Sequence, residues 1–472
     1  MIELSREKEL IKNTFVLSLG KFLPKFVSII TLPIVTAQLT KSEYGTYDLI
    51  STLIMLVMPI ATLQIQSAAF RFLIDFRGDD RNSSRIITNI FAITIPISVI
   101  VAIIIGFLMP LSDSVRIVVA FYFIADVLYL TVSQIARGLA MNKEYSISSI
   151  LLSIVNGLGI IITLAIMDKG LFGVVFSLCL ANIFSLIYLS FCTHIFDYLH
   201  ITMISTNTIK EMIAYSWPMI PNNLSTWILS LSDRLVITAA LGVEANAVYA
   251  VANKIPNMLS LAQSVFVMAW QENASLVVHD KDAASYYTKM FDTIFSLMFS
   301  FTALLIGFTP VMFYVLIRGD YDDAYYQIPL LILGMFFYCM SAFQGGIYIA
   351  HKKTKNVGIT TVFAALINFI IDILLVNIIG ITAGSLSTLI AYFLLYIYRI
   401  FDSLKFQEMH YNAKKQIKLL VILLLMLILC YQRNLYLNIV NIGLSLFVFV
   451  YTNMEYIKAI YMKLITNNRR PN

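Results

Sequence analysis

A series of fourteen apolar runs constrains this chain more than any other feature, because each is about long enough to cross a membrane. The hydrocarbon core of a bilayer is about 30 Å thick, and an α-helix needs about 20 apolar residues to span it. Backbone polar groups have no partner in lipid, so such runs are expected to be helical. The runs cover residues 13–38, 46–69, 86–109, 115–137, 147–167, 170–194, 211–241, 246–270, 288–317, 327–350, 357–379, 381–404, 416–431 and 435–457. We therefore predict an all-α polytopic membrane protein with fourteen spans, numbered here in chain order.

The composition supports a membrane protein and excludes several other classes. Of the 472 residues, 59% are hydrophobic and only 13% are charged, whereas a soluble domain has about 25% charged residues. Mean hydropathy is +0.82. These values argue against a soluble enzyme, a disordered chain and a nucleic-acid-binding protein. The four cysteines lie inside apolar runs without a CxxC pair, so we expect neither a disulfide framework nor a metal site.

The lysines and arginines predict the orientation of the spans. With the N-terminus in the cytoplasm, and with residues near the ends of spans counted with the adjoining loops, 24 of them belong to cytoplasmic segments, five to outer loops and four to the interiors of spans. This asymmetry is the positive-inside signal. An even number of spans keeps both termini in the cytoplasm. The polar N-terminus MIELSREKELIKN has no cleavage site before the first span, so we expect no signal peptide.

A weak internal repeat divides the chain into two parallel halves. QLTKSEYGTYDLI, from Gln38, aligns with ALGVEANAVYAVA, from Ala240, and Gly170 aligns with Gly380. Parallel repeats are an architecture of transporters, in which the substrate site lies at the repeat interface. We predict six-helix bundles at 13–194 and 211–404, a cytoplasmic linker at 195–210, and two additional helices within 416–457.

Polar residues recur at steps of three and four in the first two spans of each half, so each set shares one helix face. Inside a membrane such a face must meet protein or water, and we expect the four faces to line a central hydrated cavity. Interhelical hydrogen bonding is the alternative explanation. The stripes consist of Thr14, Ser18, Lys21, Lys25 and Ser28; Asp48, Thr52, Thr62 and Gln66; Asn222, Thr226, Ser230 and Asp233; and Asn253, Asn257, Ser260 and Ser264.

Charged residues on or beside these stripes carry a net positive charge. The cations are Lys21, Lys25, Arg234 and Lys254, and the anions are Asp48 and Asp233. A charge in a membrane costs at least ~2.5 kcal/mol on insertion scales, so an excess of cations predicts an anionic ligand. Snorkelling toward the headgroups is the alternative for the lysines.

Three further charged residues lie near these spans. Arg71, at the inner end of the second span, is expected to extend the basic surface toward the cytoplasm. Asp126 and Asp372 are interpreted as isolated carboxylates, either protonated and structural or used in proton coupling.

No catalytic motif is present in the sequence, and no outer loop is long enough for an active-site domain. There is no GxxxxGK[ST] or HExxH pattern, and the five histidines fall in predicted cytoplasmic loops. We expect a protein that is not an enzyme and needs no cofactor.

The order of these features resembles the polysaccharide transporter (O-antigen flippase) branch of the multidrug/oligosaccharidyl-lipid/polysaccharide (MOP) exporter superfamily. The resemblance covers nearly the whole chain. It is carried by KNTFVLSLGKFLPKFVSIITLPIVTAQLTKSEYGTYDLI, by AAFRFL, and most specifically by SWPMIPNNLSTWILSLSDRLVITAALGVEANAVYAVANKIP. Members resemble two six-helix bundles, some with two extra helices. The resemblance implies that Lys21, Lys25, Arg234 and Lys254 hold the diphosphate of a lipid-linked substrate.

The resemblance implies transport of undecaprenyl-diphosphate-linked oligosaccharide units to the outer leaflet of the bacterial cytoplasmic membrane, for lipopolysaccharide or other surface polysaccharide. Expected partners are this lipid-linked substrate, membrane lipid, a polysaccharide polymerase, and a coupling proton or sodium ion. Three alternatives remain: a lipid II flippase, a multidrug antiporter of the same superfamily, and a membrane-embedded polymerase or ligase. An antiporter for cationic drugs would need an acidic cavity, and an enzyme would need a long catalytic outer loop.

Overall fold

The computed structural model describes residues 20, 22–454 and 458, apart from some side chains within two helices, α9 and α11. Its described segments contain helices and connecting turns, and no strand occurs among them. Ten of these helices are long and apolar enough to cross a membrane, and a shorter apolar helix covers Phe22–Gln38. The prediction of an all-α polytopic membrane protein is therefore confirmed.

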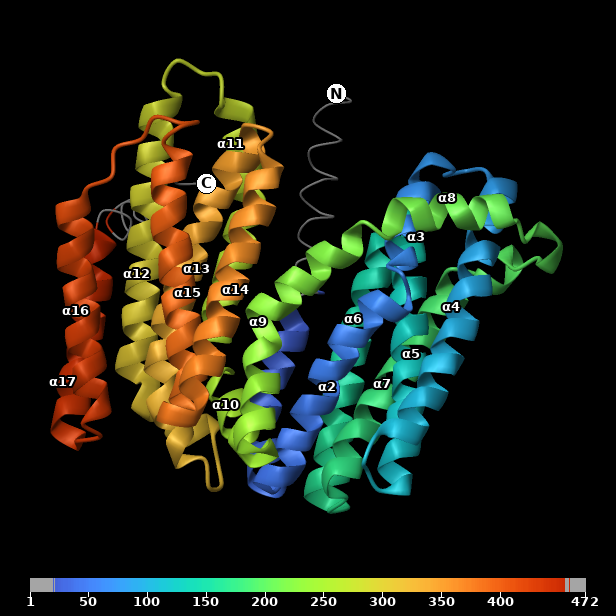
Figure 1. The fold of residues 1–472 in the computed structure, drawn as a ribbon, viewed down its shortest axis with the longest axis horizontal. Coiled ribbons are helices and arrows are strands. Elements are labelled where there is room, and N and C mark those ends of the chain that lie inside the picture. The colour runs from blue at the N-terminus through green and yellow to red at the C-terminus, as the bar shows by residue number, and fades with distance from the viewer. Residues whose placement is uncertain (1–19, 21, 455–457, 459–472) are drawn as a thin grey trace, which may run out of the picture. The chain divides into compact units, whose positions relative to one another are not determined.

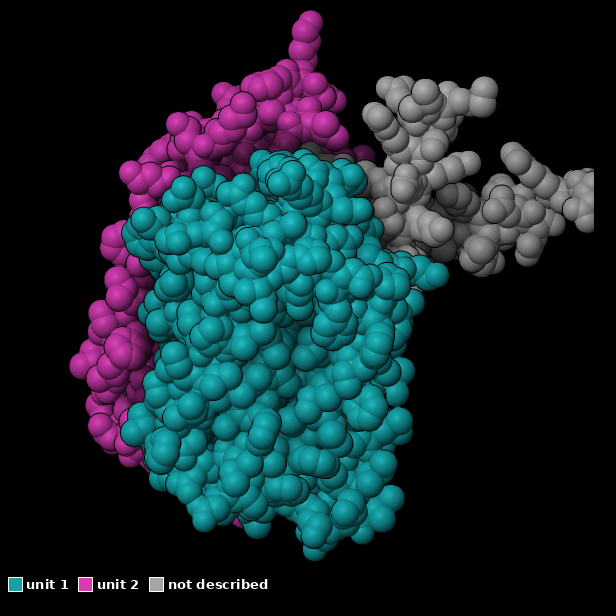
Figure 2. All heavy atoms as spheres, turned by 90° about the vertical axis from the view of Figure 1, so that its right-hand side faces the viewer, with its two compact units in different colours: residues 1–231 teal, residues 232–472 magenta. Residues whose placement is uncertain are grey.

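The chain forms two compact units, Met1–Leu231 and Ser232–Asn472, coloured separately in Figure 2. Within unit 1, the 3-10 turns Ile195–Tyr198 and Ile201–Met203 lead from α7 to α8, which packs across the ends of α3 and α4 (Figure 1). Its helices after Phe22–Gln38 are α2 (Lys41–Ala61), α3 (Ile65–Asp75), α4 (Asp80–Leu108), α5 (Asp113–Gly138), α6 (Asn142–Ile160) with a π-helical end at Ile161–Ile166, α7 (Gly170–Cys192), α8 (Thr206–Ser216) and the first half of α9 (Met219–Leu241).

Unit 2 contains the rest of α9 and eight further helices in the described part of the chain. The two C-terminal helices lie at one edge of this unit, where α17 packs along α12 (Figure 1). The helices are α10 (Val243–Ala252), α11 (Asn257–Val277), α12 (Ala283–Leu316), α13 (Asp322–Ala350), α14 (Thr354–Ile379), α15 (Thr382–Ser403), α16 (Ala413–Tyr431) and α17 (Leu435–Thr452).

Side-chain caps explain several of the helix starts. The Thr40 hydroxyl accepts a hydrogen bond from the Glu43 backbone N–H, and the Glu43 carboxylate accepts one from the Thr40 backbone N–H. This capping box satisfies donors that have no partner within the helix. Asp79 caps α4 by accepting from the Asn82 backbone N–H at 3.0 Å, and this bond lowers the pKa of Asp79. Asn412 and Asn434 cap α16 and α17 in the same way.

Three predicted spans are each built from two helices. The run 46–69 is divided between α2 and α3, because Leu63 and Gln64 adopt left-handed backbone conformations that end a right-handed helix. The run 211–241 is divided between α8 and α9, and the run 246–270 is divided at 253–256 between α10 and α11. In the last case Pro256 lacks an N–H and directly precedes α11. The sequence shows uninterrupted apolarity across these breaks, which is why single helices were expected there.

Two local features agree with the predicted repeat. Gly170 and Gly380 both have positive φ, at 51° and 62°; Gly170 begins the sixth predicted span and Gly380 directly precedes the twelfth. α2 begins at Lys41 and α10 at Val243, the same offset as the sequence alignment. The domain boundaries expected at 194, 211, 404 and 416, and the superposition of the two halves, remain predictions.

Candidate functional site

A buried carboxylate on α9 is held by hydroxyl groups from two other helices of unit 2. One oxygen of Asp233, Oδ2, accepts a hydrogen bond from the Tyr249 hydroxyl of α10 at 2.6 Å and another from the Thr388 hydroxyl of α15 at 2.8 Å. Asp233 is 4% exposed. Its second oxygen, Oδ1, accepts no hydrogen bond within the described structure. The α9 stripe therefore brings Asp233 to a contact between helices.

A second carboxylate completes this cluster from α14. Asp372 is fully buried, and neither of its oxygens accepts a hydrogen bond from a described residue. It lies close enough to Asp233 for the two charges to interact. Asn368, one turn earlier on α14, donates to the Thr388 hydroxyl at 3.2 Å, and its own carbonyl oxygen accepts no bond from the described chain.

These five residues, Asp233, Tyr249, Asn368, Asp372 and Thr388, are called the carboxylate cluster below. Four of its oxygen atoms have no donor among the described residues: both of Asp372, Oδ1 of Asp233 and Oδ1 of Asn368. Buried ionised carboxylates are costly unless they are paired, protonated or bound to a cation. Carboxylate and amide oxygens are hard ligands suited to small hard cations. The cluster therefore has the chemistry to hold a proton or a small cation.

Asp372, interpreted from the sequence as an isolated carboxylate, has no hydrogen-bond donor among the described residues but lies within electrostatic reach of Asp233, and its structural or proton-coupling role stays a prediction. The buried face of α14 is mostly apolar between Thr360 and the pair Asn368 and Asp372, so the sequence shows no continuous polar stripe there. A spacing of four residues in an apolar helix is a signal in itself, because both side chains must then share one face. The participation of Tyr249 and Thr388 has no comparable sequence signal, since they lie on other helices, 16 and 155 residues from Asp233 along the chain.

Asp48, the predicted anion of the second span, is buried on α2 in unit 1 and is 4% exposed. One turn further along the same helix, the Thr52 carbonyl accepts a hydrogen bond from the Trp227 indole N–H of α9 at 3.2 Å. This bond fixes the N-terminal half of α9 against α2 within unit 1. The polar face of α2 is therefore partly a packing surface.

The predicted cations are distributed over both units. Lys25 lies exposed on the helix Phe22–Gln38 of unit 1, and it is the only charged residue in that helix. In unit 2, Arg234 is half-buried on α9, and Lys254 is half-buried in the turn between α10 and α11. Lys254 was expected inside a continuous helix, and the break at 253–256 instead places it between two helices.

Arg71 is exposed on α3 and forms an ion pair with Asp75, one turn along the same helix, at 2.6 Å. The hydrogen bond to Asp75, together with the charge of that carboxylate, raises the pKa of the Arg71 guanidinium. Its positive charge is thus partly balanced by a local partner.

Several members of the predicted stripes fall outside the described part of the chain. Lys21, Thr14 and Ser18 are among them, as are the side chains of Asn222, Thr226 and Ser230. Their role in a cavity remains a prediction. Of the span 7 stripe, Asp233 is the member with described contacts.

Many solved structures share this fold at low sequence identity, among them the following three. An inward-facing multidrug resistance MATE family transporter of the MOP superfamily aligns with a TM-score of 0.69 and 13% identity, over 82% of this chain and 93% of that one. The lipid II flippase MurJ, in an inward closed conformation, aligns with a TM-score of 0.66 and 15% identity, over 94% of this chain and 100% of that one. A MOP superfamily transporter from Pyrococcus furiosus aligns with a TM-score of 0.58 and 11% identity, over 83% and 94% of the two chains.

The sequence comparisons assign the family. No curated protein matches the sequence. The profile of the family described as polysaccharide biosynthesis protein matches residues 10–271, which is more than half of the chain. The chain therefore belongs to the polysaccharide biosynthesis protein family, and it has the fold of the MOP superfamily transporters.

Proposed function

We propose that this protein is a flippase that moves undecaprenyl-diphosphate-linked oligosaccharide units from the inner to the outer leaflet of the bacterial cytoplasmic membrane. Membership of the polysaccharide biosynthesis family and the fold shared with a lipid II flippase support this function. The units would supply O-antigen or another surface polysaccharide. Translocation would occur by alternating access of a cationic cavity, with both termini in the cytoplasm.

Lys25 is the observation that carries the proposal. Lys25 is exposed and is the only charged residue in the described helix Phe22–Gln38, and an ammonium group within a membrane span must face water, protein or an anion rather than hydrocarbon. A diphosphate supplies that anion. Together with Lys21, Arg234 and Lys254, Lys25 would hold the diphosphate while the polyprenyl tail stays in lipid. The same excess of cations disfavours a multidrug antiporter whose substrates are cations.

The carboxylate cluster supplies a site for the coupling ion in this proposal. Either a proton or a sodium ion would neutralise Asp233 and Asp372, and the oxygen atoms without donors would surround it. The ion would be bound in unit 2 by three helices, α9, α14 and α15. A change in ion occupancy would therefore alter how tightly these helices are held together.

Complementation of a flippase-deficient bacterial strain tests the substrate-binding role of Lys25. Lys25→Ala should abolish surface polysaccharide at a normal level of membrane protein. Lys25→Arg should retain part of the activity because the charge survives while its geometry changes. Lys25→Glu should be the most severe because it repels the diphosphate. Full activity of Lys25→Glu at normal expression would contradict this role.

A further inference from the structure

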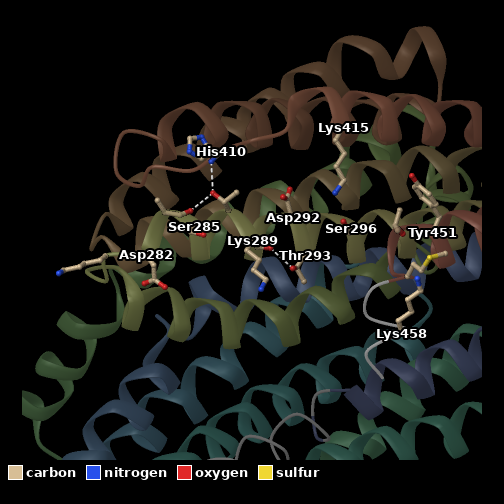
Figure 3. A pocket seen from close by; sticks show the side chains of 15 residues that line it. Asp282, Ser285, Lys289, Asp292, Thr293, Ser296, His410, Lys415, Tyr451 and Lys458 are labelled. Atoms are coloured by element: carbon tan, nitrogen blue, oxygen red, sulfur yellow. Dashed lines mark hydrogen bonds between the residues drawn. The ribbon is translucent and has the colours of Figure 1, made fainter. Parts of the chain in front are cut away.

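A polar groove lies in unit 2 where α12 begins, α16 begins and α17 ends, away from the carboxylate cluster. Its cavity volume is about 1030 Å³, and Figure 3 shows the side chains around it. We call it the α12 groove. Four lysines line it, Lys281, Lys289, Lys415 and Lys458, with two aspartates, Asp282 and Asp292. The ionic groups therefore sum to a net positive charge.

The groove has a defined frame. The backbone N–H of His410 donates to the Thr288 hydroxyl at 3.1 Å, which holds the loop before α16 against α12. The Asn453 side-chain amide donates to the Ser300 hydroxyl at 2.9 Å and fixes the end of α17 on the same helix. In Figure 3 the Lys415 side chain extends from α16 toward α12. Two separate segments are thus fastened to α12 on either side of the cavity.

The lysines of the groove are not neutralised by its aspartates. Within the described part of the chain, none of the four ammonium groups forms an ion pair, although Asp292 lines the same cavity. Ammonium groups gathered around a cavity without carboxylate partners favour an anion.

The depth of the groove indicates where that anion comes from. α12 has 34 residues, and about 20 suffice to cross the hydrocarbon core. Counted from its far end at Leu316, about 20 residues reach Leu297, so residues 283–296 cross the headgroup layer and extend about 21 Å from the hydrocarbon toward the water. The groove is built on this protruding part of α12.

An apolar surface continues from the groove toward the middle of the membrane. Leu297 lies one turn beyond Thr293 on α12 and is 40% exposed. On α17, Tyr451 stacks on Phe447 at 5.9 Å between ring centroids, and both rings are exposed. Acyl chains fit such a surface, and an aromatic residue beside lysines is typical of the membrane interface.

We propose that the α12 groove binds the phosphate headgroup of an anionic phospholipid, with the acyl chains lying along α12 and α17. Lys289 and Lys415 approach the phosphate from different helices. The bound lipid would join the two C-terminal helices to α12. This site goes beyond the proposed transport function and does not depend on it.

Binding of lipids to the purified full-length protein tests this site. Native mass spectrometry would compare phosphatidylglycerol with phosphatidylcholine on the wild type and on the double variant Lys289→Gln/Lys415→Gln. Each basic residue near an anionic lipid strengthens its binding. Removing both lysines should therefore weaken phosphatidylglycerol binding roughly tenfold or more. Lys352→Gln/Lys355→Gln is the matched control, because it removes two exposed lysines on the same predicted side outside the groove.

We expect the wild type and the control to bind phosphatidylglycerol more tightly than phosphatidylcholine. The groove variant should lose this preference. Equal lipid binding by the groove variant and the control would overturn the proposal, provided that both melt at the wild-type temperature. If the groove variant melts lower, Lys415→Gln alone replaces it. Competition by glycerol phosphate at the same concentration would assign the groove to a soluble anion instead. Preference for undecaprenyl diphosphate over phosphatidylglycerol would assign it to the transported lipid, and either outcome would also overturn the proposal.

Discussion

The Thr388 hydroxyl of α15 donates a 2.8 Å hydrogen bond to the Asp233 carboxylate of α9, although 155 residues separate the two side chains in sequence. The same hydroxyl accepts from Asn368 of α14, so one small side chain connects three helices. A ligand bound beside it would contact a junction between helices. Such a junction is where an ion can change the relative stability of two conformations.

Asp372→Asn is expected to remove the dependence of transport on the coupling ion. The change deletes the charge of the carboxylate that has no hydrogen-bond donor in the described structure. Loss of one interaction with a charged group, about 1.5–3 kcal/mol, weakens ion binding about tenfold or more. The measurement is translocation in vesicles under an imposed sodium gradient and, separately, a proton gradient.

The control for this variant is Ser387→Ala, since the Ser387 hydroxyl donates to the Gly384 carbonyl outside the carboxylate cluster. It should leave the ion dependence at the wild-type level. Thr388→Val should weaken the dependence, because it removes a donor to Asp233. If Asp372→Asn responds to both gradients as the wild type does, the carboxylate cluster only holds the helices together.

The predicted topology can be checked by cysteine labelling. In a background without the four native cysteines, Lys41→Cys and Asp320→Cys should react with an impermeant thiol reagent in intact cells, whereas Lys353→Cys should not. The positive-inside distribution is the reason for this expectation. Labelling at position 353, with none at 41, would reverse the orientation and would place the α12 groove in the opposite leaflet.

Arg399 is expected to contribute strongly to the stability of unit 2. It is 4% exposed, and its guanidinium donates to the backbone carbonyls of Ser341 and Val357 and to the Thr360 and Thr361 hydroxyls. Arg399→Met removes buried hydrogen bonds made by a charged group, so it should lower the free energy of unfolding by about 1.5–3 kcal/mol. Thermal unfolding in detergent measures the loss. Arg85→Met, at an exposed position, should melt close to the wild type.

The contact between α12 and α17 has little room at Gly307. A Cβ atom at this glycine would lie 2.6 Å from the Ser445 side chain and 3.0 Å from the Asn441 carbonyl oxygen. Gly307→Val should therefore displace α17 and destabilise the protein by about 1–3 kcal/mol. The helical Gly106 has open space around it, so Gly106→Val is the matched control. Equal melting temperatures for the two variants would show that α17 does not pack on α12 at this point.

Most of the fold follows from the apolar runs, because in a bilayer a helix satisfies its own backbone hydrogen bonds. Apart from the breaks at 62–64, 217–218 and 253–256 and a few terminal residues, the described part of each predicted span is helical. The break at Leu63 depends on a left-handed backbone conformation, and the break at 253–256 lies at Pro256, so hydropathy alone did not reveal either of them.

The candidate site was only partly predictable. Asp233 was identified because a carboxylate in an apolar run is rare and costly. Its hydrogen-bond partners Tyr249 and Thr388 are common residue types, and their contact with Asp233 depends on how the helices pack. Charge counting on Lys25 and Arg234 indicates the sign of a ligand, whereas the position of a binding site depends on tertiary structure.

Translocation by the purified protein in vesicles tests the central claim most directly. A fluorescent undecaprenyl-diphosphate oligosaccharide is placed in both leaflets, and an impermeant enzyme that cleaves the sugar is added outside. With the wild-type protein the protected inner pool should become accessible, and with Lys25→Glu it should stay protected as in vesicles without protein. Two results would contradict a cationic flippase. One is that the inner pool stays protected with correctly folded wild-type protein, and the other is that Lys25→Glu makes it as accessible as the wild type does.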